Sequence, residues 1–144
     1  MARFYIRPSN PRPDFRLVIS FLWRDFHNVD TDGNSHNPAS RDWTELYCQN
    51  RENEEEFFEV YAVQASPLVL QVESEQRWLA ARVAYFLAVE TGSGFSIHST
   101  GPFRDPVALR ELSADFDWGA AEQRAAASCW RRSTLENPYP NLET

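Results

Sequence analysis

Residues 68–97, LVLQVESEQRWLAARVAYFLAVETGSGFSI, decide the fold because they predict two strands with a helix between them. Leu68, Leu70 and Val72 alternate with other residues, as the inward-facing positions of a strand do. Residues 75–91 form the strongest helical segment of the chain, and residues 94–99 predict a short strand after it. A strand, a helix and a strand in this order indicate a domain that combines a sheet with helices.

The helix predicted over residues 75–91 has one apolar stripe, which requires a sheet to pack against. The stripe has members at positions i, i+4, i+7 and i+8, namely Leu79, Val83, Phe86 and Leu87. Ser74 is a candidate N-cap, and Gly92 can take the left-handed conformation that ends many helices.

Alternating apolar residues predict four further strands upstream, over residues 3–7, 15–23, 43–49 and 57–64. The segment 15–23 has apolar residues at every second position, from Phe15 to Trp23, and predicts a long, central strand. Residues 27–42 are rich in Asp, Asn, Ser, Gly and Pro and predict one long loop, a type of segment that is often functional. Short links between the strands favour antiparallel pairing.

The residues after the long helix predict more helical structure. Asp105 and Pro106 open a short helix, since proline is tolerated at the first helical position. A third helix is predicted from Trp118 to Arg132 with Asp117 as its cap, and the tail from Thr134 is expected to be extended. The expected fold is therefore α+β: a single domain over residues 1–144 with a mainly antiparallel sheet of about five to six strands, packed against one long helix, and with further helices at the C-terminus.

The charge of the chain is concentrated in one segment. The formal net charge is −7, and residues 52–75 contain seven Glu and no basic residue. Such a segment is either a solvated acidic face or a docking surface for a basic partner, because a concentrated field of one sign accelerates encounter and selects partners. Direct nucleic-acid binding is not expected, since this charge would repel a phosphate backbone.

Several chemistries are excluded by residue type. All 14 basic residues are Arg, so no Schiff-base lysine, pyridoxal-phosphate anchor or P-loop lysine can form. Cys48 and Cys129 have no CxxC spacing and are expected to be free, buried thiols. The N-terminus lacks the apolar core of a signal peptide, and no run of about 18 apolar residues exists. A cytoplasmic protein without a membrane span is expected.

Two segments match only part of a known functional motif. The segment from Asp30 to Asn34 resembles the start of a calcium loop, but the required Gly and Glu are replaced by Ser35 and Arg41. His98-Ser99-Thr100 is half of a two-histidine phosphoesterase signature, and neither of the other two histidines supplies the second half. No catalytic residue, no metal site and no cofactor is therefore predicted.

The stretch 68–97 resembles a segment of small bacterial immunity proteins, which are cytoplasmic antidotes to polymorphic, contact-dependent or type VI-type toxins. The shared pattern is a hydrophobic strand, a Glu/Ser entry, a helix with Ala-Arg-Val-Ala and Phe-Leu-Ala, and a Gly-rich turn into a strand. The resemblance covers about 30 residues. It implies function by occlusion of a toxin, without catalytic residues, and it transfers no individual binding residue.

The charge and the resemblance together predict a binding surface for a cognate toxin. A nuclease or nucleotide-targeting toxin is favoured, because such enzymes have basic clefts. Trp43 is included as an interface anchor because Trp beside acidic residues is common at interfaces. The predicted partner-binding residues are Asp30, Asp32, Trp43, Glu52, Glu54, Glu55, Glu56 and Glu59.

Two other functions fit the same sequence. One is a small enzyme or ligand-binding domain with a dispersed site, for which His36, Tyr47, His98 and the arginines near the long loop are the candidates. The other is an acidic, phage-type inhibitor that mimics nucleic acid. The sequence fixes neither the identity of the partner nor the oligomeric state.

Overall fold

The computed structural model describes residues 1–142, which contain one six-stranded sheet and three α-helices. The strands are β1 (Ala2–Ile6), β2 (Val29–Gly33), β3 (Glu45–Asn50), β4 (Phe57–Ala65), β5 (Leu68–Ser74) and β6 (Phe95–Ser96). Their order in the sheet is β2-β3-β4-β5-β1-β6, and every neighbouring pair is antiparallel. The prediction of an α+β fold with a mainly antiparallel sheet is confirmed.

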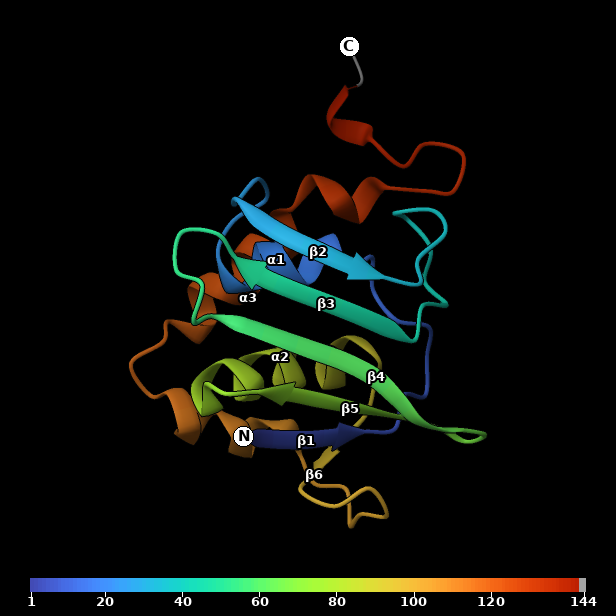
Figure 1. The fold of residues 1–144 in the computed structure, drawn as a ribbon. Helices are drawn as coiled ribbons and strands as arrows, with labels where there is room; N and C mark the ends of the chain where they lie inside the picture. Colours follow the sequence, from blue (N-terminus) through green and yellow to red (C-terminus); the bar gives the residue numbers. More distant parts are fainter. Residues whose placement is uncertain (143–144) are drawn as a thin grey trace.

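The helices form a second layer on one face of the sheet, and the other face is left uncovered (Figure 1). This layer contains α1 (Arg16–Leu22), α2 (Arg77–Glu90) and α3 (Trp118–Ala127). Three short 3-10 helices follow in the C-terminal half: η1 (Pro106–Ser113), η2 (Cys129–Arg132) and η3 (Pro140–Leu142). None of the helices formed by residues 1–142 has the length and the apolar composition needed to cross a bilayer.

Helix α2 supplies the centre of the core, as its apolar stripe predicts. It packs on β1 and β5, and the rings of Phe86 and Phe21 from α1 stack with their centroids 4.6 Å apart. The expected N-cap Ser74 is wrong, because the helix begins at Arg77 with Gln76 as its N-cap; Ser74 Oγ instead accepts a hydrogen bond from the backbone N–H of Gln76 (3.1 Å). Gly92 follows the helix with φ 65°, the left-handed conformation expected of it. With 14 residues α2 is the longest helix described, but α1 and α3 share the layer with it.

The predicted strand over residues 15–23 is wrong, because this segment forms helix α1. Its residues are apolar at almost every position, and all seven residues of α1 are buried. A short run that is buried on all sides has no polar face to reveal its period, so alternation alone does not separate a strand from a helix.

The predicted loop over residues 27–42 contains strand β2, which pairs with β3 from Val29 opposite Asn50 to Gly33 opposite Leu46. The strand lies at the edge of the sheet, where polar residues on both faces are tolerated and charges discourage further pairing. Its sequence therefore resembles a loop. The last predicted strand shortens to two residues, and the predicted third helix ends at Ala127 and continues as η2.

Candidate functional site: the open face of the sheet

The face of the sheet that carries no helix, called the open face below, presents alternate residues of five strands. The side chains of the opposite phase, such as Phe58 and Val60 of β4, are buried in the core. Strand register arranges the open face in three rows that run across the strands. The first row is Asp30, Gln49 and Phe57; the second is Asp32, Tyr47, Glu59, Glu73 and Arg3; the third is Glu45, Tyr61, Gln71 and Tyr5.

Carboxylates and aromatic rings alternate in the half of the open face formed by β2, β3 and β4. Tyr47 lies between Asp32 and Glu59 in its row, and Tyr61 lies next to Glu45. These five residues line a shallow depression of about 290 Å³. Directly opposed residues of neighbouring strands lie about 5 Å apart, so a carboxylate and the tyrosine ring beside it can contact the same side chain of a partner here.

A positive charge balances the acid only in the other half of the open face, which is formed by β5 and β1. Arg3 Nε donates to Glu73 Oε2 (2.8 Å), and Gln71 Nε2 donates to the same oxygen (2.8 Å). Burial and the nearby Glu73 carboxylate raise the pKa of Tyr61, which keeps its hydroxyl protonated. This half of the face is a closed polar network.

Three acids of the open face have no cationic partner within residues 1–142: Asp32, Glu45 and Glu59. Asp30 is 3.6 Å from Arg51 in an exposed pair, which contributes little to stability and separates readily. The carboxylates of Asp32, Glu45 and Glu59 share one surface without a balancing cation among the described residues, so their field would attract a basic partner.

The acidic run 52–56 lies in the turn between β3 and β4, at one end of the open face (Figure 1). Glu52 is 3.4 Å from Arg24 and 3.5 Å from His27, so its charge is partly balanced. Glu56 accepts hydrogen bonds from Asn53 (2.8 Å) and Trp23 (3.4 Å). Glu52 and Glu56 of the acidic run therefore have partners within the chain.

Glu54 and Glu55, at the tip of this turn, are exposed. Of the predicted partner-binding residues, Asp30, Asp32 and Glu59 lie on the open face, and Glu52, Glu54, Glu55 and Glu56 lie in the adjoining turn.

The prediction that Trp43 anchors an interface is wrong. Trp43 is 1% exposed, and its Nε1 donates to the backbone oxygen of Pro13 (2.8 Å). It fills the core beneath β3, so a partner cannot reach the ring unless the core opens.

The open face also contains functional candidates that the acidic run did not indicate. Glu45, Tyr61 and Glu73 join the face through strand register, which no sequence pattern specified. The sequence pattern that indicates such residues is the alternation within a strand: Glu45 and Tyr47 alternate with the buried Leu46 and Cys48, so they belong to the opposite, exposed face.

The residues of the dispersed-site alternative do not come together. His36 is exposed on the segment after the edge strand β2, and His98 is exposed after β6 at the opposite edge. Tyr47 lies on the open face between them. Residues 1–142 contain no cluster of three or more His, Cys, Asp or Glu side chains suited to a metal ion.

The two cysteines are poor nucleophiles. Burial raises the pKa of Cys48 to about 12 and that of Cys129 to about 11, and the Asp25 carboxylate adds to the effect at Cys129. A thiol is reactive as its thiolate, so neither side chain is activated at neutral pH. Both are free, as predicted; Cys48 is buried and Cys129 is half-buried.

Comparisons of the chain with protein-family models, with curated proteins and with solved structures give no match.

Proposed function

We propose that this chain is an immunity protein that binds a basic antibacterial toxin in the cytoplasm and blocks the toxin's active site. The observation that carries the proposal is the open face, a helix-free sheet surface on which three unpaired carboxylates alternate with two tyrosine rings. The resemblance of residues 68–97 to immunity proteins supports it independently.

The open face is suited to protein recognition for two physical reasons. Tyrosine rings bury a large area with few rotatable bonds, so they bind at low entropic cost and are enriched at interfaces. The carboxylates stand on β-strands, so the backbone positions from which they extend are fixed before a partner arrives. Such preorganisation lowers the cost of association.

A nuclease or nucleotide-targeting toxin is the favoured partner class because its substrate is anionic. An active site that holds phosphates has clustered Arg and Lys side chains, and it is complementary to Asp32, Glu45 and Glu59. Complementary fields raise the association rate and select against acidic partners. Arginine in particular can pair with a carboxylate and stack on an adjacent tyrosine.

Growth rescue combined with capture tests the proposal. The chain is produced together with the toxin candidate encoded beside it, and rescue of growth is measured for the wild type, Glu59→Arg and Glu111→Arg. Glu111 is an exposed acid on η1, in the helical layer, and matches the change of charge. We expect rescue by the wild type and by Glu111→Arg, and loss of rescue with Glu59→Arg.

Capture from the native host with the same three proteins identifies the partner. The proposal requires that one toxin-like protein is retained by the wild type and by Glu111→Arg and is depleted with Glu59→Arg. If no neighbouring gene product is toxic and no protein is retained selectively, the proposal is wrong.

A further inference from the structure

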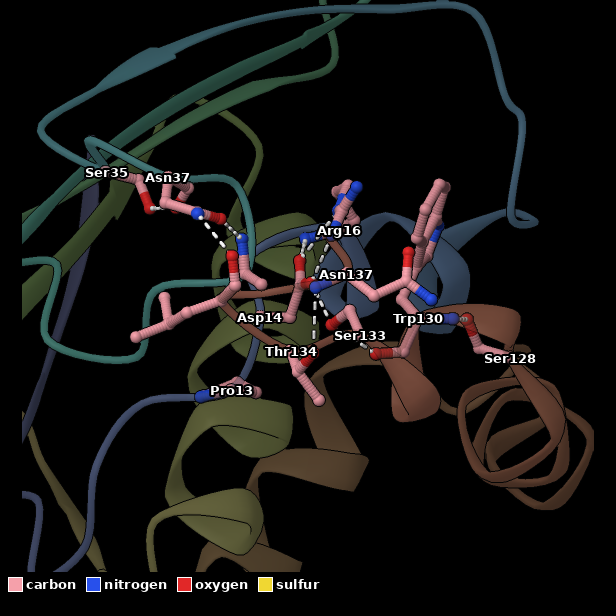
Figure 2. Close-up of polar contacts among 12 residues, drawn as sticks. Pro13, Asp14, Arg16, Ser35, Asn37, Ser128, Trp130, Ser133, Thr134 and Asn137 are labelled. Atoms are coloured by element: carbon pink, nitrogen blue, oxygen red, sulfur yellow. Dashed lines mark hydrogen bonds and ion pairs between the residues drawn. The ribbon is translucent and has the colours of Figure 1, made fainter. Parts of the chain in front are cut away.

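Arg16 contacts a carboxylate and an aromatic ring at the same time. Its Nε and Nη2 bind the two oxygens of Asp14 (3.0 and 2.6 Å), and its guanidinium carbon lies 3.8 Å from the centre of the Trp130 ring. Figure 2 shows Arg16 between these two partners. A guanidinium can make both contacts because its flat face covers a ring while its N–H edge reaches a carboxylate.

Arg110 repeats this combination in the helical layer. It forms an ion pair with Glu122 of α3, and its guanidinium carbon is 5.0 Å from the centre of the Tyr85 ring of α2. The three side chains come from different helices, so the combination does not depend on a local sequence motif. An arginine, a carboxylate and an aromatic ring thus occur together twice within this fold.

Strands β2, β3 and β4 of the open face carry the carboxylates and the rings of this combination but no arginine. Tyr47 lies opposite Asp32 of β2 and Glu59 of β4, and Tyr61 lies opposite Glu45 of β3. None of these three acids has a cationic partner among residues 1–142. A partner can therefore supply the arginine.

Contacts within the sheet restrict both tyrosine rings. The Tyr61 hydroxyl accepts a hydrogen bond from Gln71 Nε2 (2.5 Å) and donates to Glu73 Oε2 (3.4 Å). The Tyr47 ring packs beside Phe57, with the ring centroids 6.3 Å apart. Both tyrosines are half-buried, so part of each side chain is accessible. Because the rings are already restricted, a partner that stacks on them loses little side-chain entropy.

Lysine fits this surface less well than arginine. Its ammonium group is compact and strongly hydrated, and it has no flat face that can cover a ring. A metal ion is not indicated either, since the part of the chain that the structure describes has no cluster of three or more His, Cys, Asp or Glu suited to one. The cation that matches both the rings and the acids is a guanidinium.

We propose that the open face binds an arginine side chain of its partner in preference to lysine. The guanidinium packs on the Tyr47 ring and donates to Asp32 or Glu59, and Tyr61 and Glu45 line the same depression of about 290 Å³. This inference rests on the proposed function and specifies the side chain that the basic partner presents.

Titration of the full chain with N-acetylarginine amide and with N-acetyllysine amide, followed by NMR, tests this inference. The two probes have the same charge, so attraction to the acids is shared. We expect saturable shifts of the Tyr47 ring signals, with a Kd about two- to fivefold lower for the arginine probe, the effect of one exposed cation–π contact. N-acetylcitrulline amide has a similar shape without the charge and is expected to cause no saturable shift.

Two variants separate the role of the ring from that of the charge. Tyr47→Leu keeps every acid but removes the ring, so it is expected to bind the arginine and lysine probes equally. Tyr5→Leu, on β1 in the other half of the open face, is expected to retain the preference for arginine.

Three outcomes would overturn the inference: no saturable shift at Tyr47 with the arginine probe, equal binding of the two probes by the wild type, or an unchanged preference in Tyr47→Leu. The wild-type comparison decides the matter even if a variant fails to fold. Growth rescue and capture do not depend on these titrations, so failure of this inference is distinguishable from failure of the proposed function.

Discussion

Asp14 connects distant parts of the chain through a single buried side chain. It is 0% exposed; one oxygen accepts from the backbone N–H and Nε of Arg16, and the other accepts from Arg16 Nη2 and from Ser133 Oγ (2.7 Å). Figure 2 shows these contacts beside Trp130 and the C-terminal segment. Asp14 thereby links α1 to the C-terminal segment.

Asp14→Ala is expected to lower the free energy of unfolding by about 3–5 kcal/mol, because it leaves the Arg16 charge buried without its partner. Urea unfolding followed by tryptophan fluorescence measures the change. Arg24→Gln is the control: it breaks the exposed Arg24–Glu52 pair and is expected to cost at most about 1 kcal/mol. Equal losses in the two variants would contradict this role for Asp14.

Asp25 makes stability depend on pH in the acid range. Its pKa is lower in the folded chain than the ordinary value of 3.8, so its contribution is complete above that pH and is lost as the pH falls through the folded-state pKa. Asp25→Asn removes the titrating group. Thermal unfolding should show the wild type more stable than the variant at neutral pH, and the difference should shrink below pH 3.8. A difference that stays constant with pH would refute the assignment.

At the scale of elements, the sequence predicted the type and position of the strands and helices that have one exposed side and one buried side. Strands β3 and β4 and helix α2 were located to within two residues because their polar and apolar positions alternate at a clear period. Helix α1 and strand β2 were missed for opposite reasons. The helix is buried all round, so its apolar residues also fit the period of a strand, and the strand is polar on both faces, so it shows no period.

The pairing of β2 with β3 requires glycine at position 33. A Cβ on Gly33 would lie 2.3 Å from the backbone oxygen of Glu45, so Gly33→Ala must separate the two strands at that end. At Gly119 in α3 the nearest atom to an added Cβ is 3.7 Å away, an ordinary contact.

Thermal unfolding should therefore separate the two substitutions. Gly33→Ala is expected to destabilise the chain and to speed amide exchange in β2, whereas Gly119→Ala should stabilise it by about 0.5–1 kcal/mol, the helical preference of Ala over Gly. If Gly33→Ala is as stable as the wild type, the register of β2 is wrong.

At the scale of the whole molecule, helices on one face of the sheet leave the other face free for recognition (Figure 1). The sequence located the acidic segment but not the surface, because a surface depends on register between strands distant in sequence. Glu45 and Glu59 come together only through the pairing of β3 with β4, and Trp43, predicted at the interface, lies in the core.

The proposed toxin-binding surface is the half of the open face formed by β2, β3 and β4, where Asp32, Glu45 and Glu59 have no cationic partner among residues 1–142. Isothermal titration of the captured partner with two matched double variants tests it most directly. Asp32→Arg/Glu59→Arg reverses two acids of the open face, and Glu111→Arg/Glu136→Arg reverses two exposed acids elsewhere, with the same change in net charge. Any effect of overall charge is therefore shared by both variants.

The open-face variant is expected to weaken binding by about a hundredfold or more, equivalent to about 2.7 kcal/mol. The matched variant is expected to stay within about threefold of the wild type, since charges outside the interface change affinity little. Equal affinities for the two double variants would contradict the claim that this face is where the partner binds.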